Sequence, residues 1–244
     1  LATVTSKLGN LRQAAMLWHK CERKYSIHDF FNEAQPKVLS VRSDLTKEAT
    51  FMPLARAIFT LFTRQLCERP ETTTDLTHIL ADELRNHGRL RGLLNGLSKS
   101  PSRGARWYLG VHSEQGIFAE YGQHRGQEIL GMASAVAGFK LNDPTTQKYA
   151  ATLIGGDIEG IKPEFSFSNS SGPNAQSSVT TGNPIRTHAT ILSQELGNLE
   201  PASRESGLTG FFRSADQPAP WKATLSAEFI DYALGKPSED PGCI

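Results

Sequence analysis

The sequence predicts an α/β fold with a mostly parallel sheet and flanking helices. Strand-like and helix-like segments alternate between residues 37 and 155, which is the pattern of strands joined by crossover helices. The expected strands are short and mostly apolar, as in a sheet that is covered on both faces. An acidic pair, Asp82-Glu83, directly follows one of these strands. Since ligands bind at the carboxyl ends of strands in such sheets, a site is expected there.

The first part of the chain is expected to be mainly helical. Apolar residues recur at three- and four-residue steps over 7–24, which predicts an amphipathic helix. A short helix is expected over 26–31 with Ser26 as its N-cap, and a short strand over 37–41. The segment 53–66 is apolar over much of its surface, which predicts a well-buried helix.

Strands and helices then alternate through the acidic pair. Strands are expected at 77–81, 107–111 and 135–141. Helices are expected near 90–97, over 117–132 with a break near Gly122, and from Asp143-Pro144 to about 154, where Asp143 serves as the cap. This order predicts one parallel sheet.

The amino-acid composition changes after Gly156. Residues 166–183 are rich in Ser, Asn, Gly and Thr, and a flexible loop is expected there. A small β extension and a final helix are expected from Ile191 onward, followed by a disordered tail.

Composition excludes several classes of protein. The net charge of +1 gives no global footprint for nucleic acid. A local cluster of basic residues is expected to be a solvated face; its members are Arg89, Arg91, Lys99, Arg103 and Arg106. Three distant cysteines without CxxC spacing indicate a reducing compartment and no zinc site. No apolar run reaches the ~20 residues of a membrane span. Because the first residue is Leu1 and not Met, the chain is expected to be a piece of a longer protein.

The acidic pair has a clear use in nucleotide hydrolysis. The first carboxylate can orient a magnesium ion or its water ligands, and the second can polarise the attacking water and accept its proton. The alternative, on these residues alone, is a solvated strand end or helix start. The phosphate-cradling GxxxxGK[ST] loop (Walker A) is absent from the chain.

The neighbouring motifs resemble those of the type IV secretion coupling proteins, the VirD4/TraD-like ATPases that pump DNA during bacterial conjugation. "GRLRGL" at 88–93 is similar to the family's "GRLPGL", and "LGVHS" at 109–113 to its "LG(I/L)QS" strand. "YG" at 121–122 matches the end of the following helix, and 129–155 is similar to the helix, strand and "LNDPETAKYLSELIG" that come next. The resemblance covers roughly residues 10–200.

The resemblance implies a RecA-like P-loop NTPase motor domain that works as a hexameric ring around DNA, with ATP and magnesium between subunits. In the family the phosphate loop precedes an all-α insertion, so a chain beginning inside that insertion would lack its N-terminal Walker A portion. The implied domains are the end of the all-α insertion (1–36), a nucleotide-binding core with Walker B (37–165), a flexible loop (166–190), a C-terminal extension of the motor domain (191–235) and a disordered tail (236–244).

The resemblance also implies roles for individual residues. Asp82 would help to place Mg²⁺, mostly through water, and Glu83 would activate the attacking water. His112 stands where the family has a glutamine that senses the γ-phosphate; the plain alternative is a structural histidine. The family's arginine-finger position is Pro101 here, and Arg103 could substitute after a local shift and act in trans, or else be simply solvated.

The leading hypothesis is therefore the Walker B to C-terminal portion of an ATP-driven, DNA-translocating coupling protein. Its implied partners are DNA, further copies of itself, relaxosome proteins and type IV secretion channel proteins. The full-length protein would sit on the cytoplasmic face of the bacterial inner membrane through upstream helices, while this chain itself would be soluble and inactive as an ATPase on its own.

The alternative is a non-enzymatic remnant or accessory protein that retains the fold but cannot bind ATP alone. The residues at positions 101 and 112 are what this alternative predicts, whereas the intact acidic pair favours the motor. A flavodoxin-like binding domain would need a phosphate-holding loop after its first strand, and none is present.

Overall fold

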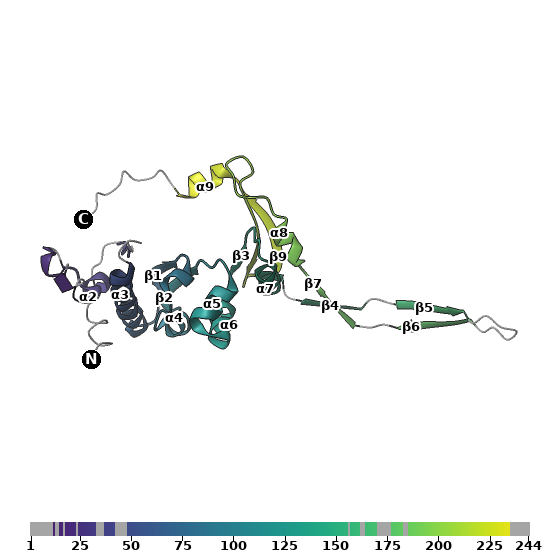
Figure 1. Cartoon of the computed structure of the whole chain (residues 1–244), viewed down its shortest axis with the longest axis horizontal. Helices are drawn as coiled ribbons and strands as arrows, with labels where there is room; N and C mark the ends of the chain where they lie inside the picture. Colours follow the sequence, from purple (N-terminus) through teal and green to yellow (C-terminus); the bar gives the residue numbers. More distant parts are fainter. Residues whose placement is uncertain are drawn as a thin grey trace. The chain divides into compact units, whose positions relative to one another are not determined.

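The structure is a computed structural model, and it describes residues 12, 15–16, 18–22, 24–32, 37–41, 48–155, 157–161, 164–169, 177–182 and 185–234. The chain divides into two compact units, Leu1–Met132 and Ala133–Ile244 (Figure 1). The boundary between them falls inside the segment 37–165, which the sequence assigns to one nucleotide-binding core. That domain assignment stays a prediction.

The first unit contains a two-stranded parallel sheet with helices around it. Strand β1 (Thr72–Ala81) pairs with β2 (Arg103–Leu109), and Ala81 lies opposite Leu109. Its helices are α2 (Ile27–Asn32), α3 (Glu48–Glu68), the 3₁₀ helix η2 (Leu84–His87), α4 (Leu93–Lys99), α5 (Glu114–Tyr121) and α6 (Gln123–Gly131). The parallel pairing confirms the predicted α/β class for this part of the chain.

The register of β1 against β2 is regular only toward the carboxyl end. Five consecutive pairs join Thr77–Ala81 to Ala105–Leu109. Between Thr72 and Thr77 the register shifts, so β1 bulges away from its neighbour near the amino end. The ordered half of the sheet is therefore the half that leads into Asp82-Glu83.

A hydrophobic core lies directly beneath the acidic pair. Ala81 and Leu84, the residues on either side of Asp82-Glu83, are both buried. The other buried members of this core are Leu90, Leu93, Ile117, Tyr121 and Ile129. Burying a side chain of the size of Leu84 stabilises a fold by about 1.5–3 kcal/mol. The backbone of Asp82-Glu83 is thus anchored on both sides by buried apolar residues.

The helices expected before β1 agree with the structure where they are described. Ser26 Oγ accepts a hydrogen bond from His28 N at 3.1 Å, which confirms the predicted cap of α2. Helix α3 contains the predicted 53–66 segment, with Pro53 inside it. The prediction that this helix is well buried is wrong, because Leu54 and Leu61 are exposed and only Thr63 and Leu66 of the segment are buried. The helix predicted over 7–24 lies largely outside the described residues.

The strand predicted over 37–41 is wrong. These residues have no regular secondary structure, and Val38 is 94% exposed. A strand needs a neighbour that accepts and donates its backbone hydrogen bonds, and the described strands form no ladder with this segment. An apolar pattern alone does not provide that neighbour.

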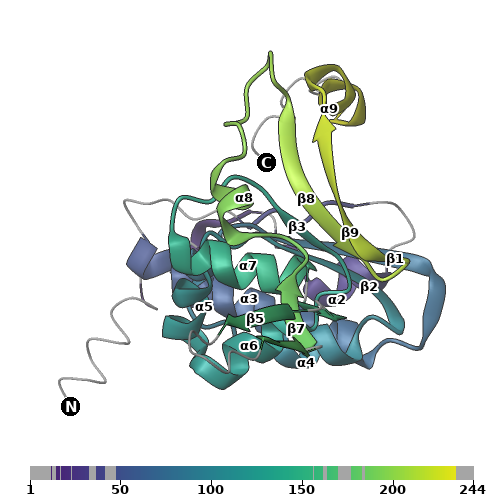
Figure 2. The ribbon, with the colours of Figure 1, turned by 90° about the vertical axis from the view of Figure 1, so that its right-hand side faces the viewer.

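The second unit is built around an antiparallel sheet of order β3-β8-β9. Figure 2 shows β8 (Leu208–Ser214) and β9 (Gln217–Leu225) as long neighbouring strands, with the short β3 (Val136–Gly138) beside β8. Helices α7 (Pro144–Gly155), α8 (Ser193–Gly197) and α9 (Ala227–Leu234) complete it. Its buried core consists of Ala151, Ile154, Ile191, Leu196, Leu199 and Phe211. The small β extension and final helix that were predicted from Ile191 onward are confirmed.

The prediction that β3 continues the parallel sheet is wrong. Ala137 lies opposite Phe212 in an antiparallel ladder between β3 and β8. A three-residue strand carries a periodicity that indicates extended backbone, but nothing in it selects a partner. The choice is made by β8, which lies more than sixty residues further along the chain.

Helix α7 begins with the predicted capping chemistry. Asp143 Oδ2 accepts hydrogen bonds from Thr146 N at 2.8 Å and from Thr146 Oγ1 at 2.7 Å. These bonds lower the pKa of the Asp143 carboxyl below its ordinary value, because both stabilise the charged form.

The segment predicted as a flexible loop contains strands. Strand β4 (Asp157–Ile161) pairs with β7 (Ile185–Ala189), and β5 (Glu164–Asn169) pairs with β6 (Ser177–Gly182), both antiparallel. Polar composition excludes a buried core but does not exclude a ribbon whose backbones pair with each other, and Thr and Val favour extended backbone. The tail predicted at 236–244 lies outside the described residues.

Candidate functional site

The carboxyl edge of the β1–β2 sheet brings together three of the predicted site residues. Because the strands are parallel and Ala81 pairs with Leu109, the residues that follow them emerge side by side. His112 Nε2 lies 3.3 Å from Glu83 Oε1, and Asp82 precedes Glu83 in the chain. The expected convergence of these residues is therefore present, while their catalytic roles stay predictions.

Glu83 has an unusual backbone conformation. Its φ of 48° and ψ of 53° lie in the left-handed region, and among the described residues no other non-glycine residue has a positive φ. Such a conformation costs on the order of 1–3 kcal/mol and is commonly found at functional sites. Leu84 N donates to Gly110 O at 3.0 Å and Gly110 N donates to Ala81 O at 2.9 Å, so β2 holds the turn in place.

The Glu83 carboxylate is oriented by neighbours on both oxygens. Asn86 Nδ2 donates a short hydrogen bond to Oε2, and His112 faces Oε1. The side chain of Glu83 is 49% exposed and that of His112 is 84% exposed. Glu83 is therefore positioned but open to water. Asn86 was not predicted as part of the site; its only sequence signal is its place three residues after Glu83, in the first turn of η2.

Asp82 is held close to the end of β2. Its Oδ1 accepts a hydrogen bond from Glu83 N at 2.9 Å, and its carbonyl oxygen lies 2.9 Å from His87 Nε2. A Cβ added to Gly110 would lie 2.5 Å from Asp82 Oδ1 and 3.3 Å from Asp82 Cα. Only glycine at position 110 permits Asp82 to lie this close with its side chain in the observed position.

The donor set suits magnesium held mainly through water. Among the described residues, no group of three or more His, Cys, Asp or Glu side chains is arranged to hold a metal. Magnesium in nucleotide sites keeps several waters and takes one or two carboxylates together with phosphate oxygens. A single carboxylate, that of Asp82, beside an exposed Glu83 fits this requirement and does not fit a protein-only metal cage.

Arg103 is not part of this convergence. It opens β2 at the amino end, opposite Thr72, whereas Asp82 and Glu83 follow the other end of the sheet. Its guanidinium donates a short hydrogen bond to the carbonyl oxygen of Arg69. Pro101, the residue at the family's arginine-finger position, lies in the turn before β2, where its carbonyl oxygen accepts from Gly104 N at 3.2 Å. Action of Arg103 in trans stays a prediction.

The α/β fold is that of a fragment of a RecA-like domain, and residues 1–244 contain no GxxxxGK[ST] loop. Residues 2–220 match the model of one family, described as the type IV secretion-system coupling protein DNA-binding domain. The chain belongs to this family of type IV secretion coupling proteins.

Solved structures of coupling proteins have the same fold. The bacterial conjugative coupling protein TrwBdeltaN70, in a trigonal form with sulphate, is 17% identical with a TM-score of 0.62, covering 83% of this chain and 44% of that one. TrwB with the ATP analogue ADPNP is 18% identical with a TM-score of 0.53, covering 72% and 37%. TrwB with ADP and Mg²⁺ is 17% identical with a TM-score of 0.51, also covering 72% and 37%.

This chain therefore spans less than half the length of these TrwB chains. No curated protein matches it in a sequence search. Across the part of the chain that the structure describes, no helix combines the length and the apolar character needed to cross a bilayer.

Proposed function

We propose that this chain forms the Walker B part of an ATP-driven motor that translocates DNA in type IV secretion. The observation that carries the proposal is the strained, outward-facing Glu83 at the end of a parallel strand, with Asp82 before it and His112 facing it. Membership in the coupling protein family supports the proposal. So do the related TrwB structures, which hold an ATP analogue or ADP with Mg²⁺.

Each residue has a role that its geometry permits. Magnesium, when bound, neutralises charge on the phosphates. The Asp82 carboxylate would hold that ion through water. The Glu83 carboxylate orients the attacking water and accepts its proton, while Asn86 restrains the other carboxylate oxygen. His112 donates a hydrogen bond from Nε2 to a phosphate oxygen in place of its contact with Glu83.

The remaining parts of the motor come from outside residues 1–244 in this proposal. Backbone amides and a lysine that hold the β- and γ-phosphates are not in this chain, since it has no GxxxxGK[ST] loop. Further copies in a hexameric ring, relaxosome and channel proteins, and an anchor at the inner membrane belong to the same proposal. Arg103 would act on a neighbouring copy only after releasing the carbonyl oxygen of Arg69.

A second candidate is a non-enzymatic coupling protein that keeps this fold. Two observations favour it, namely the histidine at position 112 and the proline at position 101, where the family has glutamine and a basic residue. The two candidates differ in one measurable property, the dependence of ATP turnover on Glu83.

The decisive experiment measures DNA-stimulated ATP turnover by the native, full-length protein and its Glu83→Gln variant. The amide keeps the shape of the side chain but cannot accept a proton, so we expect turnover to fall by about 10²- to 10⁴-fold with nucleotide binding retained. Glu128→Gln, at an exposed position of α6, is the matched control and leaves turnover unchanged. Equal turnover by the Glu83→Gln variant and the wild type would sink the motor proposal. Absence of any turnover in the wild type would favour the non-enzymatic candidate.

A further inference from the structure

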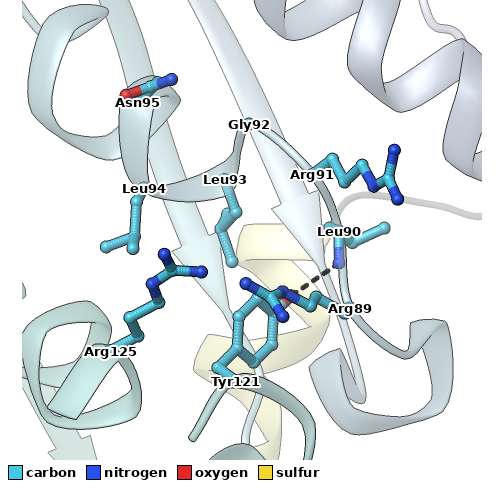
Figure 3. A pocket seen from close by; sticks show the side chains of 9 residues that line it. All are labelled: Arg89, Leu90, Arg91, Gly92, Leu93, Leu94, Asn95, Tyr121 and Arg125. Atoms are coloured by element: carbon cyan, nitrogen blue, oxygen red, sulfur yellow. Dashed lines mark hydrogen bonds between the residues drawn. The ribbon is translucent and has the colours of Figure 1, made fainter.

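The loop between η2 and α4 forms one wall of a pocket of about 520 Å³. Leu90, Leu93 and Tyr121 give it a buried apolar floor, and exposed arginines stand around it. In Figure 3 the side chains of Arg89 and Arg125 both reach toward Tyr121, whereas Arg91 points away from them. The two arginines come from different elements, the loop and α6, and both line this pocket.

The position of Arg89 is fixed by Tyr121. Tyr121 OH accepts a hydrogen bond from Leu90 N at 3.1 Å (Figure 3). It also donates one to Gly88 O at 3.4 Å, so it binds the backbone on both sides of Arg89. Burial raises the pKa of the Tyr121 phenol, which keeps the hydroxyl proton in place for this role. The loop that carries Arg89 is therefore built into the core and is not a loose surface turn.

The guanidinium groups of the pocket are not used by the fold. Within the part of the chain that the structure describes, no carboxylate pairs with Arg89, Arg91 or Arg125, and no acidic side chain lines the pocket. Glu120 is the acidic residue whose charge acts on Tyr121, but Arg56 and Arg89 oppose it there. A cluster of unpaired cations that lacks a neutralising carboxylate attracts anions.

We infer that the pocket formed by Arg89, Arg125 and Tyr121 binds backbone phosphates of a DNA strand. A guanidinium offers paired donors that match two phosphate oxygens, and most protein contacts to DNA go to phosphates and sugars. Tyr121 is only 6% exposed, so its ring is not a platform for stacking bases. Contacts of this pocket with DNA phosphates therefore do not depend on the DNA sequence, as a motor that moves along DNA requires. The choice of DNA rests on the proposed function; the anion-binding chemistry does not.

The test compares binding of a short fluorescein-labelled single strand of mixed sequence, measured by anisotropy without ATP across a salt series. The Arg89→Gln/Arg125→Gln double variant of the full chain is matched by a Lys148→Gln/Arg204→Gln double variant, which removes the same charge at exposed positions of the second unit. Loss of two phosphate contacts raises Kd at least about tenfold. It also reduces the slope of log K against log salt by about 1.4, since each contact to a single strand contributes about 0.7.

A second variant guards against misfolding. Arg89→Lys/Arg125→Lys keeps both charges but loses the paired donors, so it keeps the salt slope and binds more weakly than the wild type. An unchanged Kd and slope in the glutamine variant overturns the inference, as does an equal loss in the Lys148/Arg204 control.

A parallel titration with a fluorescent ATP analogue distinguishes the source of the phosphate. If the Arg89→Gln/Arg125→Gln variant no longer binds the analogue but binds DNA as the wild type does, the pocket is a nucleotide site and the DNA assignment is overturned. Failure of the motor proposal would be seen separately, as unchanged ATP turnover in the Glu83→Gln variant. That result does not affect the DNA-binding measurement, which is made without ATP.

Discussion

The two ends of the β1–β2 sheet treat their charged residues in opposite ways. At the amino end, Arg69 pairs with Asp75 and donates to Thr77 Oγ1 at 2.8 Å, while Arg103 donates to the carbonyl oxygen of Arg69. The side chain of Arg69 is only 16% exposed. The charged groups here bind each other and the backbone.

At the carboxyl end the charged groups face solvent. Glu83 and His112 touch each other, but both remain accessible, and the backbone of Glu83 is strained. A polar contact between two solvent-exposed side chains contributes at most about 1 kcal/mol to stability. The comparison teaches that the two ends of one sheet differ in how their polar side chains are used: those at the amino end hold the strands together, whereas Glu83 and His112 at the carboxyl end remain accessible to solvent.

The largest expected difference in stability between the two ends comes from replacing a glycine at each of them. Gly104 lies at the amino end of β2, and Gly110 directly follows its carboxyl end. Gly104 has a φ of 84°, and an added Cβ would overlap the backbone oxygen of Asp75. Gly104→Ala should lower the free energy of unfolding by about 2–4 kcal/mol, the sum of backbone strain and overlap. Gly110→Ala should cost about 1–2 kcal/mol, because the overlap there is mostly with the Asp82 side chain, which can turn away. Urea denaturation measures both, and a larger loss from Gly110→Ala would contradict the comparison.

A smaller effect is expected from removing the central cation of the amino end. Arg69→Met leaves Asp75 and Thr77 without their partner, and hydrogen bonds to charged groups are worth about 1–3 kcal/mol. The control is Arg64→Met, since Arg64 pairs with Glu68 on the exposed face of α3 and should matter little. Thermal unfolding followed by circular dichroism compares the two. Equal losses would show that the amino end is no more tightly bound than an ordinary surface.

The smallest effect is expected at Glu83 itself. Glycine adopts the left-handed region without strain, so Glu83→Gly should be more stable than Glu83→Gln by about 1 kcal/mol. Both variants lack the carboxylate, which makes the glutamine variant the matched reference. Guanidinium denaturation measures the difference. If glycine is the less stable of the two, the backbone at position 83 is not strained and the carboxyl end is not kept open at the expense of stability.

Elements fixed by local chemistry could be predicted from the sequence. Ser26 and Asp143 cap helices because capping depends on residues two or three positions away. The strand that ends in Asp82-Glu83 could be predicted because apolar residues lead directly into two carboxylates. The approach of His112 followed from the parallel order of two neighbouring strands.

Features that depend on distant partners could not be predicted. The antiparallel pairing of β3 with β8 joins residues far apart in the sequence, and the 37–41 segment has apolar residues but no described strand to pair with. The contact of Arg103 with the carbonyl oxygen of Arg69 depends on the register at the start of the sheet, which the shift between Thr72 and Thr77 sets. Spacing alone does not reveal such a shift.

That register shift has a consequence for how the chain tolerates changes in length. Between the pairs Thr72–Arg103 and Thr77–Ala105, β1 advances five residues while β2 advances two. The surplus backbone is already looped out before the regular pairing begins. An insertion or deletion within 73–76 would lengthen or shorten this loop without moving Ala81 past Leu109, so Asp82 and Glu83 keep their position when the other end of their strand changes in length.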